Sequence, residues 1–156
     1  MRHEFYSDNI LDAYERFHQI LLQMGIKESP ADRRAVISNC FVFKDDPYNT
    51  YDKSYWWPHT DAGYSALVYL NKVDNTGTNI YKCLEPDYEG EDVREHEQPW
   101  RPKEHYELLF NLEPKYNRAV IFNSNLFHET DSYEFKEGYE NRRINVTLLF
   151  GRREDS

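Results

Sequence analysis

A single helical segment followed by many short strand-like runs is the feature that most constrains the fold of this chain. Beyond residue 35, runs rich in β-branched and aromatic residues alternate with turn signals, and the helical period does not return. The runs span 35–43, 55–59, 65–71, 78–84, 106–112, 119–123 and 143–150. This order predicts an antiparallel sandwich or barrel with one helix packed outside.

The helix is predicted over residues 8–25. Asp8 is placed to cap its start and Gly25 its end. Its apolar residues recur at three- and four-residue steps, and they are Ile10, Leu11, Tyr14, Phe17, Leu21 and Met24. The stretch 28–34, with Pro30 and several charges, indicates a connector into a β-core of about 35–150.

The length of 156 residues is enough for one hydrophobic core, so we expect a single domain over 1–156. Residues 85–104 form an acidic stretch with three prolines, which predicts a long insertion in the β-core. Insertions of this length in compact domains are usually lids or disordered segments. Aromatic residues are frequent, at 16%, and we assign most of them to the core of a small β-rich domain.

Charge and hydropathy limit the partners and the location that we expect. A formal net charge of -9 argues against nucleic acid as the main partner, because affinity for phosphate backbones depends on Lys and Arg. The chain has no apolar run long enough for a membrane span and no apolar signal segment near its start, so we expect no membrane and a cytoplasmic protein. Cys40 and Cys83 then stay reduced rather than bridged.

The pair His59-x-Asp61 and the distant His128 are candidate metal ligands. Residues at i and i+2 of an extended segment share a face, so the side chains of His59 and Asp61 converge. With a second imidazole from His128 they make the facial triad that leaves three positions of Fe(II) open. His-x-Asp alone is weak evidence, and a structural role is the bland alternative for either histidine. We interpret His3, His18, His96 and His105 as ordinary surface or second-layer residues.

The last strand-like run carries candidate anion-binding residues. Polar and apolar residues alternate from 143 to 150, which places Arg143, Asn145 and Thr147 on one face. An inward arginine is costly unless an anion meets it, and its planar fork suits a dicarboxylate. The alternative is a salt bridge to one of the 28 acidic residues. Arg142 is a rival, but it shares parity with the apolar residues.

Taken together, these segments resemble a known family. The matching elements, in order, are His59-x-Asp61, Tyr69-Leu70-Asn71, Gly77-Thr78, the run 117–122, His128 and Arg143-x-Asn145-x-Thr147. They resemble the core of the Fe(II)/2-oxoglutarate-dependent dioxygenase superfamily, specifically its prolyl-4-hydroxylase-like branch, over roughly residues 55–150. The resemblance implies a mainly β fold: a double-stranded β-helix (jelly-roll, cupin-like) core with the N-terminal α-helix outside.

The resemblance also implies an activity. Fe(II) would be held by His59, Asp61 and His128, the co-substrate 2-oxoglutarate by Arg143 and Tyr69, and dioxygen would take the last metal position. Asn145 and Thr147 are expected to face the same site. The expected reaction is hydroxylation of a protein residue (proline-like) or a small molecule, with release of succinate and CO2. The retained carboxylate of Asp61 argues against a halogenase, in which halide replaces that ligand.

Two features separate this chain from the family pattern, and two other functions remain as alternatives. Arg143 follows His128 at a somewhat long separation, and the chain is short, so either dimerisation as a homodimer or a minimal core compensates. The residues 55–58 and the insertion are candidates for the substrate mouth. One alternative is a cupin-like metal-binding protein without oxygenase activity. The other is a non-catalytic β-sandwich binding module that uses its aromatic residues.

Overall fold

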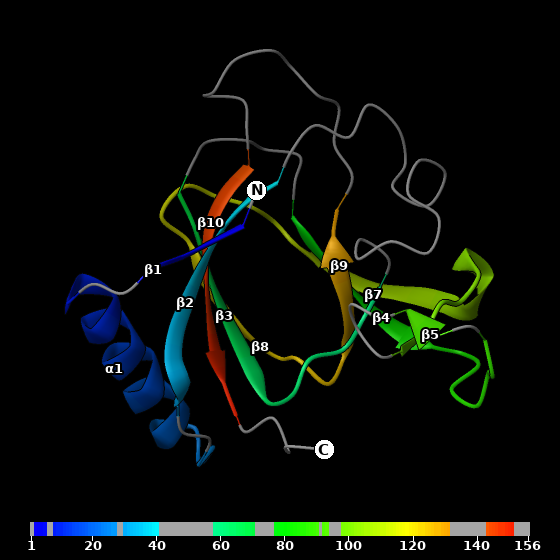
Figure 1. The fold of residues 1–156 in the computed structure, drawn as a ribbon, viewed down its shortest axis with the longest axis horizontal. Coiled ribbons are helices and arrows are strands. Elements are labelled where there is room, and N and C mark those ends of the chain that lie inside the picture. The colour runs from blue at the N-terminus through cyan, green and yellow to red at the C-terminus, as the bar shows by residue number, and fades with distance from the viewer. Residues whose placement is uncertain are drawn as a thin grey trace.

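The computed structural model describes residues 2–5, 8–27, 30–40, 58–70, 77–90, 92–93, 98–131 and 143–151. For 2–5, 8–10, 30–40, 92–93, 98 and 143 it describes the backbone alone. This part of the chain is mainly β, with one long helix (Figure 1). The elements in chain order are β1 (Arg2–Phe5), α1 (Asp8–Gln23), β2 (Pro30–Cys40), β3 (Tyr64–Tyr69), β4 (Thr78–Cys83), β5 (Asp92–Val93), β6 (Gln98–Pro99), η1 (Lys103–His105), β7 (Tyr106–Leu112), β8 (Ala119–Asn123), β9 (Phe127–Thr130) and β10 (Arg143–Phe150). The predicted mainly β class is confirmed.

The strands form two main antiparallel sheets. The larger sheet has the order β1-β2-β10-β3-β8, and the smaller has the order β7-β4-β9. In Figure 1, β10, β3 and β8 stand on one side of the molecule, and β9, β4 and β7 stand opposite them. A buried cluster joins the two sheets, with Leu67 and Phe122 from the larger sheet and Ile80 from the smaller. Strands far apart in the sequence therefore meet across one interior.

Helix α1 covers the outer face of the larger sheet. Tyr14 and Leu21 are buried against Leu148 and Phe150 of β10, and the rings of Tyr14 and Phe150 meet edge to face with centroids 5.3 Å apart. Gly25 ends the helix in the left-handed region (φ 79°), and the Ile26 amide donates to the Leu21 carbonyl over 2.9 Å. The predicted helix and its place outside the sheet are confirmed. Two residues assigned to its apolar face, Leu11 and Met24, are instead exposed.

Alternation along β3 and β10 gives the larger sheet two distinct faces. Ala66 and Leu148 belong to the cluster under the helix, whereas Leu67 and Tyr69 belong to the cluster between the sheets. Asn145 pairs directly with Tyr69, and Thr147 pairs with Leu67. Directly opposed residues of an antiparallel pair share a face. Asn145 and Thr147 therefore face the interior, as predicted.

Several sequence-based expectations about the strands are wrong. The stretch predicted as a connector is part of β2 from Pro30 onward, because this backbone pairs with the end of β10. Strands β1 and β9 were not predicted at all. The predicted run 55–59 lies outside the described residues except for Pro58, which is buried, and His59, which forms an isolated bridge.

The insertion contains short ordered elements in its described part. Strands β5 and β6 pair with each other, and the turn η1 leads into β7. The Arg101 side chain is buried, and it donates to the carbonyls of Glu85, Pro86 and Pro99 over 3.4, 3.2 and 3.2 Å. One buried arginine thus joins the beginning and the end of this segment.

Two further expectations concern the cysteines and the membrane. Cys83 is a free thiol, whereas the side chain of Cys40 lies outside the described residues. Among the described residues, no helix is both long and apolar enough to cross a membrane.

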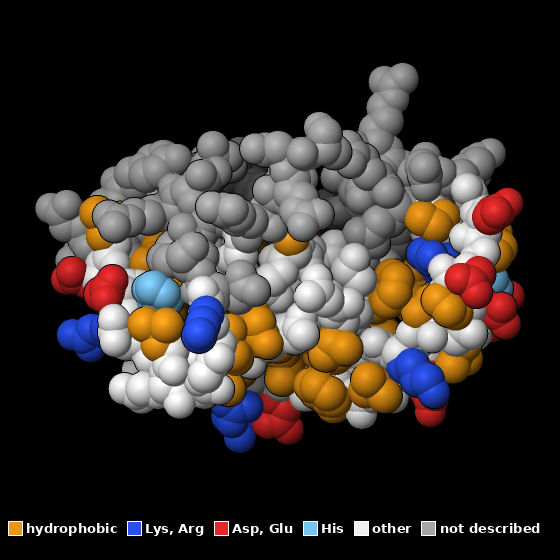
Figure 2. Space-filling model, turned by 90° about the horizontal axis from the view of Figure 1, so that it is seen from below, with side chains coloured by type: hydrophobic (Ala, Val, Ile, Leu, Met, Phe, Trp, Pro, Cys, Tyr) orange, Lys and Arg blue, Asp and Glu red, His pale blue; other side chains and the backbone are white. Residues whose placement is uncertain are grey.

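Hydrophobic side chains are also exposed on the surface. Leu108, Leu109 and Phe110 of β7 are exposed, and β7 is an edge strand among the described strands of its sheet. The view of the molecule from below shows hydrophobic side chains gathered in the middle of that face, with charged side chains toward both ends and at the lower edge (Figure 2).

Candidate metal centre

Backbone pairing brings together the three residues predicted as metal ligands. His59 and His128 exchange two backbone hydrogen bonds, with His59 N to His128 O at 3.0 Å and His128 N to His59 O at 2.8 Å. The Asp61 amide donates to the Ser124 carbonyl over 2.8 Å. The segment that carries His59 and Asp61 is therefore fixed against the turn before β9, although about 60 residues separate the two in sequence.

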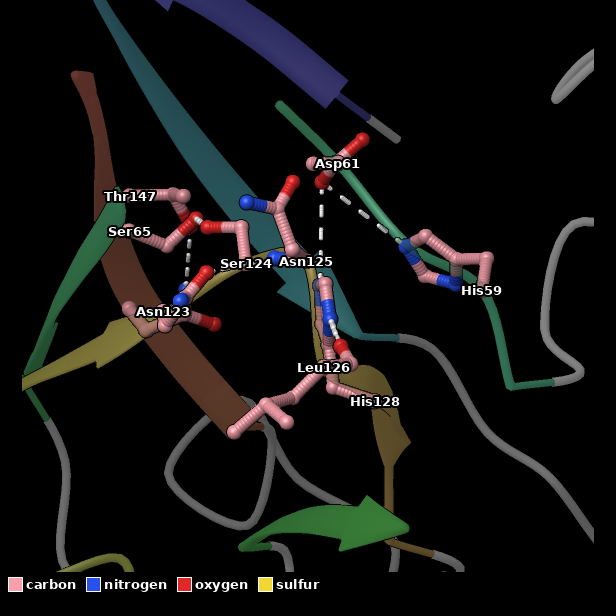
Figure 3. A network of polar contacts seen from close by, with 10 residues as sticks. His59, Asp61, Ser65, Asn123, Ser124, Asn125, Leu126, His128 and Thr147 are labelled. Atoms are coloured by element: carbon pink, nitrogen blue, oxygen red, sulfur yellow. Dashed lines mark hydrogen bonds and ion pairs between the residues drawn. The ribbon is translucent and has the colours of Figure 1, made fainter. Parts of the chain in front are cut away.

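The imidazoles of His59 and His128 both point toward the carboxylate of Asp61 (Figure 3). Asp61 Oδ2 lies 3.6 Å from His128 Nε2 and 4.0 Å from His59 Nε2. One ligand atom from each of the three residues lies within 4.8 Å of the others. Two ligands with bonds of about 2.1 Å to one ion stand at most about 4.2 Å apart, so a small side-chain movement closes the set on an ion. Two imidazoles and a carboxylate fit a divalent transition metal.

The imidazole of His128 is oriented by a backbone carbonyl. Its Nδ1 lies 2.9 Å from the Leu126 carbonyl oxygen, which can only accept a hydrogen bond. Nδ1 therefore carries the proton when the ring is neutral, and the lone pair is on Nε2, which is the atom that faces Asp61. Metal-binding histidines are commonly held in this way through their second nitrogen.

A tight turn and a pair of serines hold Asp61. Gly63 has φ +80°, and a Cβ placed there would lie 1.9 Å from the Phe150 carbonyl oxygen, so only glycine fits this close approach. The hydroxyls of Ser65 and Ser124 are buried and 2.6 Å apart. The Ser124 amide also donates to the Gly63 carbonyl over 2.9 Å. The turn after Asp61 is thus bonded to the turn before His128 at several points.

Asn145 presents an unpaired polar atom to the interior. Its side chain is only 1% exposed, and its Nδ2 donates to the Thr147 hydroxyl over 3.0 Å. Among the described residues, its Oδ1 has no hydrogen-bond partner. The Thr147 hydroxyl can donate as well as accept, so the amide can also turn and offer Nδ2 instead. In either orientation a buried amide atom remains to bind a polar ligand, since leaving it unmet is costly.

Tyr69 and Arg143 were predicted to bind the same anion. Tyr69 faces the interior opposite Asn145, and its hydroxyl contacts the Thr78 hydroxyl at 3.0 Å and the Leu112 carbonyl at 3.3 Å. Arg143 begins β10, where its backbone pairs with Cys40, but its side chain is outside the described residues, as is all of Arg142. Carboxylate binding by Tyr69 and Arg143 therefore stays a prediction.

Sequence reasoning overlooked the residues that support the ligands. The Ser65 and Ser124 pair and the Leu126 carbonyl were not identified. A serine in a turn has many ordinary roles, and a backbone carbonyl leaves no signal in the sequence. Of the histidines set aside, His18 and His105 are not part of the triad group.

Neither a scan of protein-family models nor a search of curated proteins gives a match for this chain.

Proposed function

We propose that this chain is an Fe(II)- and 2-oxoglutarate-dependent oxygenase with a double-stranded β-helix core. The convergence of His59, Asp61 and His128 from two distant segments is the observation that carries the proposal. Such a triad occupies one side of a metal and leaves the opposite positions open for co-substrate and dioxygen. The resemblance of the same residues to the prolyl-4-hydroxylase-like branch gives this triad its chemistry.

The strand order supports the jelly-roll part of the proposal. If β2 is the first core strand and the His59 segment the second, then β3, β4, β7, β8, β9 and β10 are the third to the eighth. The larger sheet then reads first, eighth, third, sixth, and the smaller reads fifth, fourth, seventh. The His59 to His128 bridge attaches the second strand to the seventh. Such repeated crossing between two sheets is typical of jelly rolls.

The proposed roles of the chain's own residues follow from their positions. His59, Asp61 and His128 would hold Fe(II), which with 2-oxoglutarate supplies the oxidising chemistry. The Leu126 carbonyl keeps the His128 Nε2 lone pair directed at the metal.

The far carboxylate of 2-oxoglutarate would be held from β10 and β3. Turned so that its Oδ1 accepts from the Thr147 hydroxyl, the Asn145 amide would offer Nδ2 as a donor to that carboxylate. Arg143, two residues before Asn145 on the same strand, supplies the charge that a dicarboxylate needs. Tyr69 would add a hydroxyl donor if it exchanged one of its present partners for the ligand. The proposed site thus places the anion between the two sheets.

The primary substrate is proposed as a protein residue (proline-like) or a small molecule. The Asp61 side chain is 38% exposed, so the centre is open to solvent on that side and accessible to a substrate that does not enter the interior. The surface charge of an acidic chain favours a neutral or basic substrate over an acidic one.

A cupin-like metal-binding protein without oxygenase activity is the second candidate. The observation that favours it is the Tyr69 hydroxyl, which is already bonded between the sheets instead of free for a ligand. Such a protein needs the triad but no anion-binding group at Asn145. A non-catalytic β-sandwich binding module, the third candidate, needs neither.

Anaerobic titration separates these three functions. Fe(II) and then 2-oxoglutarate are added to the metal-free protein, and the visible charge-transfer band of the chelate is recorded. The oxygenase gives a band that disappears in His59→Ala and needs far more 2-oxoglutarate in Arg143→Ala, with Arg142→Ala as the neighbouring control. Metal binding without a band supports the cupin-like protein. Absence of metal binding contradicts the triad and leaves the binding module.

A further inference from the structure

The two proposed histidine ligands are each preceded by a residue that contacts Tyr106. The Tyr106 hydroxyl donates to the carbonyl of Pro58, which precedes His59, over 3.2 Å. The Tyr106 ring lies 5.3 Å, centroid to centroid, from the ring of Phe127, which precedes His128. Tyr106 begins β7 and is 9% exposed. One buried side chain thus touches both segments that carry the histidines.

The contact with Phe127 lies on the opposite side of β9 from the His128 side chain. Consecutive residues of a strand point to opposite faces, so Phe127 faces outward where His128 faces inward. Pro58 is fully buried, and its carbonyl belongs to the peptide unit that begins His59. Fixing that carbonyl therefore fixes the plane of the peptide that carries the His59 amide, which itself bonds to His128.

The same contact connects the metal centre to the insertion. The Arg101 guanidinium lies 5.3 Å from the centroid of the Phe127 ring, within the range of a cation-π interaction. Arg101 is buried and bonded to carbonyls at both ends of the insertion. Phe127 therefore contacts both Tyr106 and Arg101. Neither residue belongs to the triad, and each is fixed by its own hydrogen bonds to backbone carbonyls.

We propose that Tyr106 is a positioning residue that keeps His59 and His128 at the separation needed to bind one metal ion. It acts through Pro58 and Phe127 and touches neither the metal nor a substrate. The inference rests on the proposed metal centre, because it assigns a role at that same site. Without Tyr106, the histidines keep their backbone pairing but lose the support behind it.

The test removes one hydroxyl and compares it with a matched loss elsewhere. Tyr106→Phe keeps the ring and removes the bond to Pro58. Tyr14→Phe removes another buried hydroxyl, which accepts from the Leu149 amide over 3.3 Å beneath the helix and is part of a separate cluster. Co(II) alone is titrated into each metal-free protein and followed by its visible absorption, and exchange of the His59 and His128 amide protons is measured without metal.

The expected result is a Co(II) dissociation constant raised by about 5-fold in Tyr106→Phe, somewhat less than the loss caused by removing a direct partner of a ligand. Tyr14→Phe should bind Co(II) as the parent does. Exchange at the His59 amide should become faster only in Tyr106→Phe. Equal effects of the two variants on either quantity overturn the proposal, because they would show a general loss of stability.

Two further outcomes are covered by the same design. If the parent binds no Co(II), the proposed metal centre is wrong, and the amide exchange alone decides whether Tyr106 orders the His59 segment. If Tyr106→Phe does not fold, Phe127→Leu tests the other contact, since it keeps an apolar side chain and removes the ring that faces Tyr106 and Arg101. Unchanged Co(II) affinity in Phe127→Leu then refutes the positioning role.

Discussion

Asn145→Val should make the protein more stable and its ligand site weaker. The side chain of Asn145 is 1% exposed, and one of its amide atoms has no partner among the described residues. Valine is similar in size, suits a strand and brings no polar atom. If the unmet atom is kept for a ligand, folding stability and ligand affinity must change in opposite directions.

The expected magnitude follows from the contacts of the amide. Loss of the Nδ2 bond to Thr147 costs about 1 kcal/mol, and removal of the unsatisfied oxygen relieves about 1–3 kcal/mol. Each newly buried methyl group adds roughly 0.8 kcal/mol. Together these effects give a gain of about 1.5–3.5 kcal/mol, and fitting the valine methyls into the core costs roughly 1–2 kcal/mol. We therefore expect the free energy of unfolding to rise by about 1–2 kcal/mol in the absence of ligand.

Urea denaturation at equilibrium measures both effects, with redox-inert Mn(II) present and with or without 2-oxoglutarate. At 100 times its dissociation constant, the ligand should stabilise the parent by about 2.7 kcal/mol. A ten-fold weaker variant should gain only about 1.4 kcal/mol at the same concentration. Destabilisation of ligand-free Asn145→Val by more than 1 kcal/mol would refute the reasoning, since the amide would then be satisfied. An unchanged ligand shift would separate Asn145 from the anion site.

The remaining predictions concern the core, the pH dependence and the metal. Leu148→Ala, at a fully buried position under the helix, should lower the free energy of unfolding by about 3 kcal/mol in urea, whereas Leu109→Ala at the exposed edge strand should change it by less than about 0.5 kcal/mol. Burial raises the pKa of Tyr106 from 10.0 to about 12, so the unfolded chain loses this proton first, and stability should fall between pH 10 and 12 by at most about 1.4 kcal/mol per pH unit. Tyr106→Phe should show a shallower decline in alkaline urea titrations; an equal slope would contradict the assignment. Asp61→Asn should weaken Co(II) binding by more than about 100-fold, beyond the loss expected for a partner of a ligand, and His105→Gln should leave it unchanged.

The spacing of polar and apolar residues was sufficient to predict which residues are buried in those helices and strands whose two faces differ in polarity. The alternation of 143–150 predicted that Asn145 and Thr147 share one face and Val146 and Leu148 the other. In the structure, the first pair faces the interior and the second lies under the helix. The three- and four-residue spacing of α1 found Tyr14 and Leu21 correctly. The same spacing failed for Met24, which follows the last helical residue, Gln23, and is exposed.

Elements defined by distant partners were not predictable in this way. Strand β9 is four residues long and has no apolar alternation of its own, and it exists because β4 pairs with it and His59 bridges to it. Pro30 resembles a connector residue because proline has no backbone N–H to donate to a neighbouring strand. It is accommodated as the first residue of β2, opposite Phe150, where the missing N–H does not interrupt the strand interior. Strand parity predicted that His59 and Asp61 share a face, and the family resemblance supported His128 as the third residue. In the structure, their convergence results from those same long-range pairings.

Groups of the core support each residue of the proposed metal centre. Asp61 is fixed by the Ser124 carbonyl, His128 by the Leu126 carbonyl, and His59 by the backbone of β9. The insertion adds a second layer through Arg101, whose contact with Phe127 lies directly behind a ligand. The Arg101 side chain also donates to carbonyls of Glu85, Pro86 and Pro99 within the insertion. Arg101→Met should therefore weaken metal binding and loosen the insertion together. Proteolysis within the insertion and Co(II) affinity should therefore change in parallel, and independent changes would mean that the insertion is only attached beside the centre.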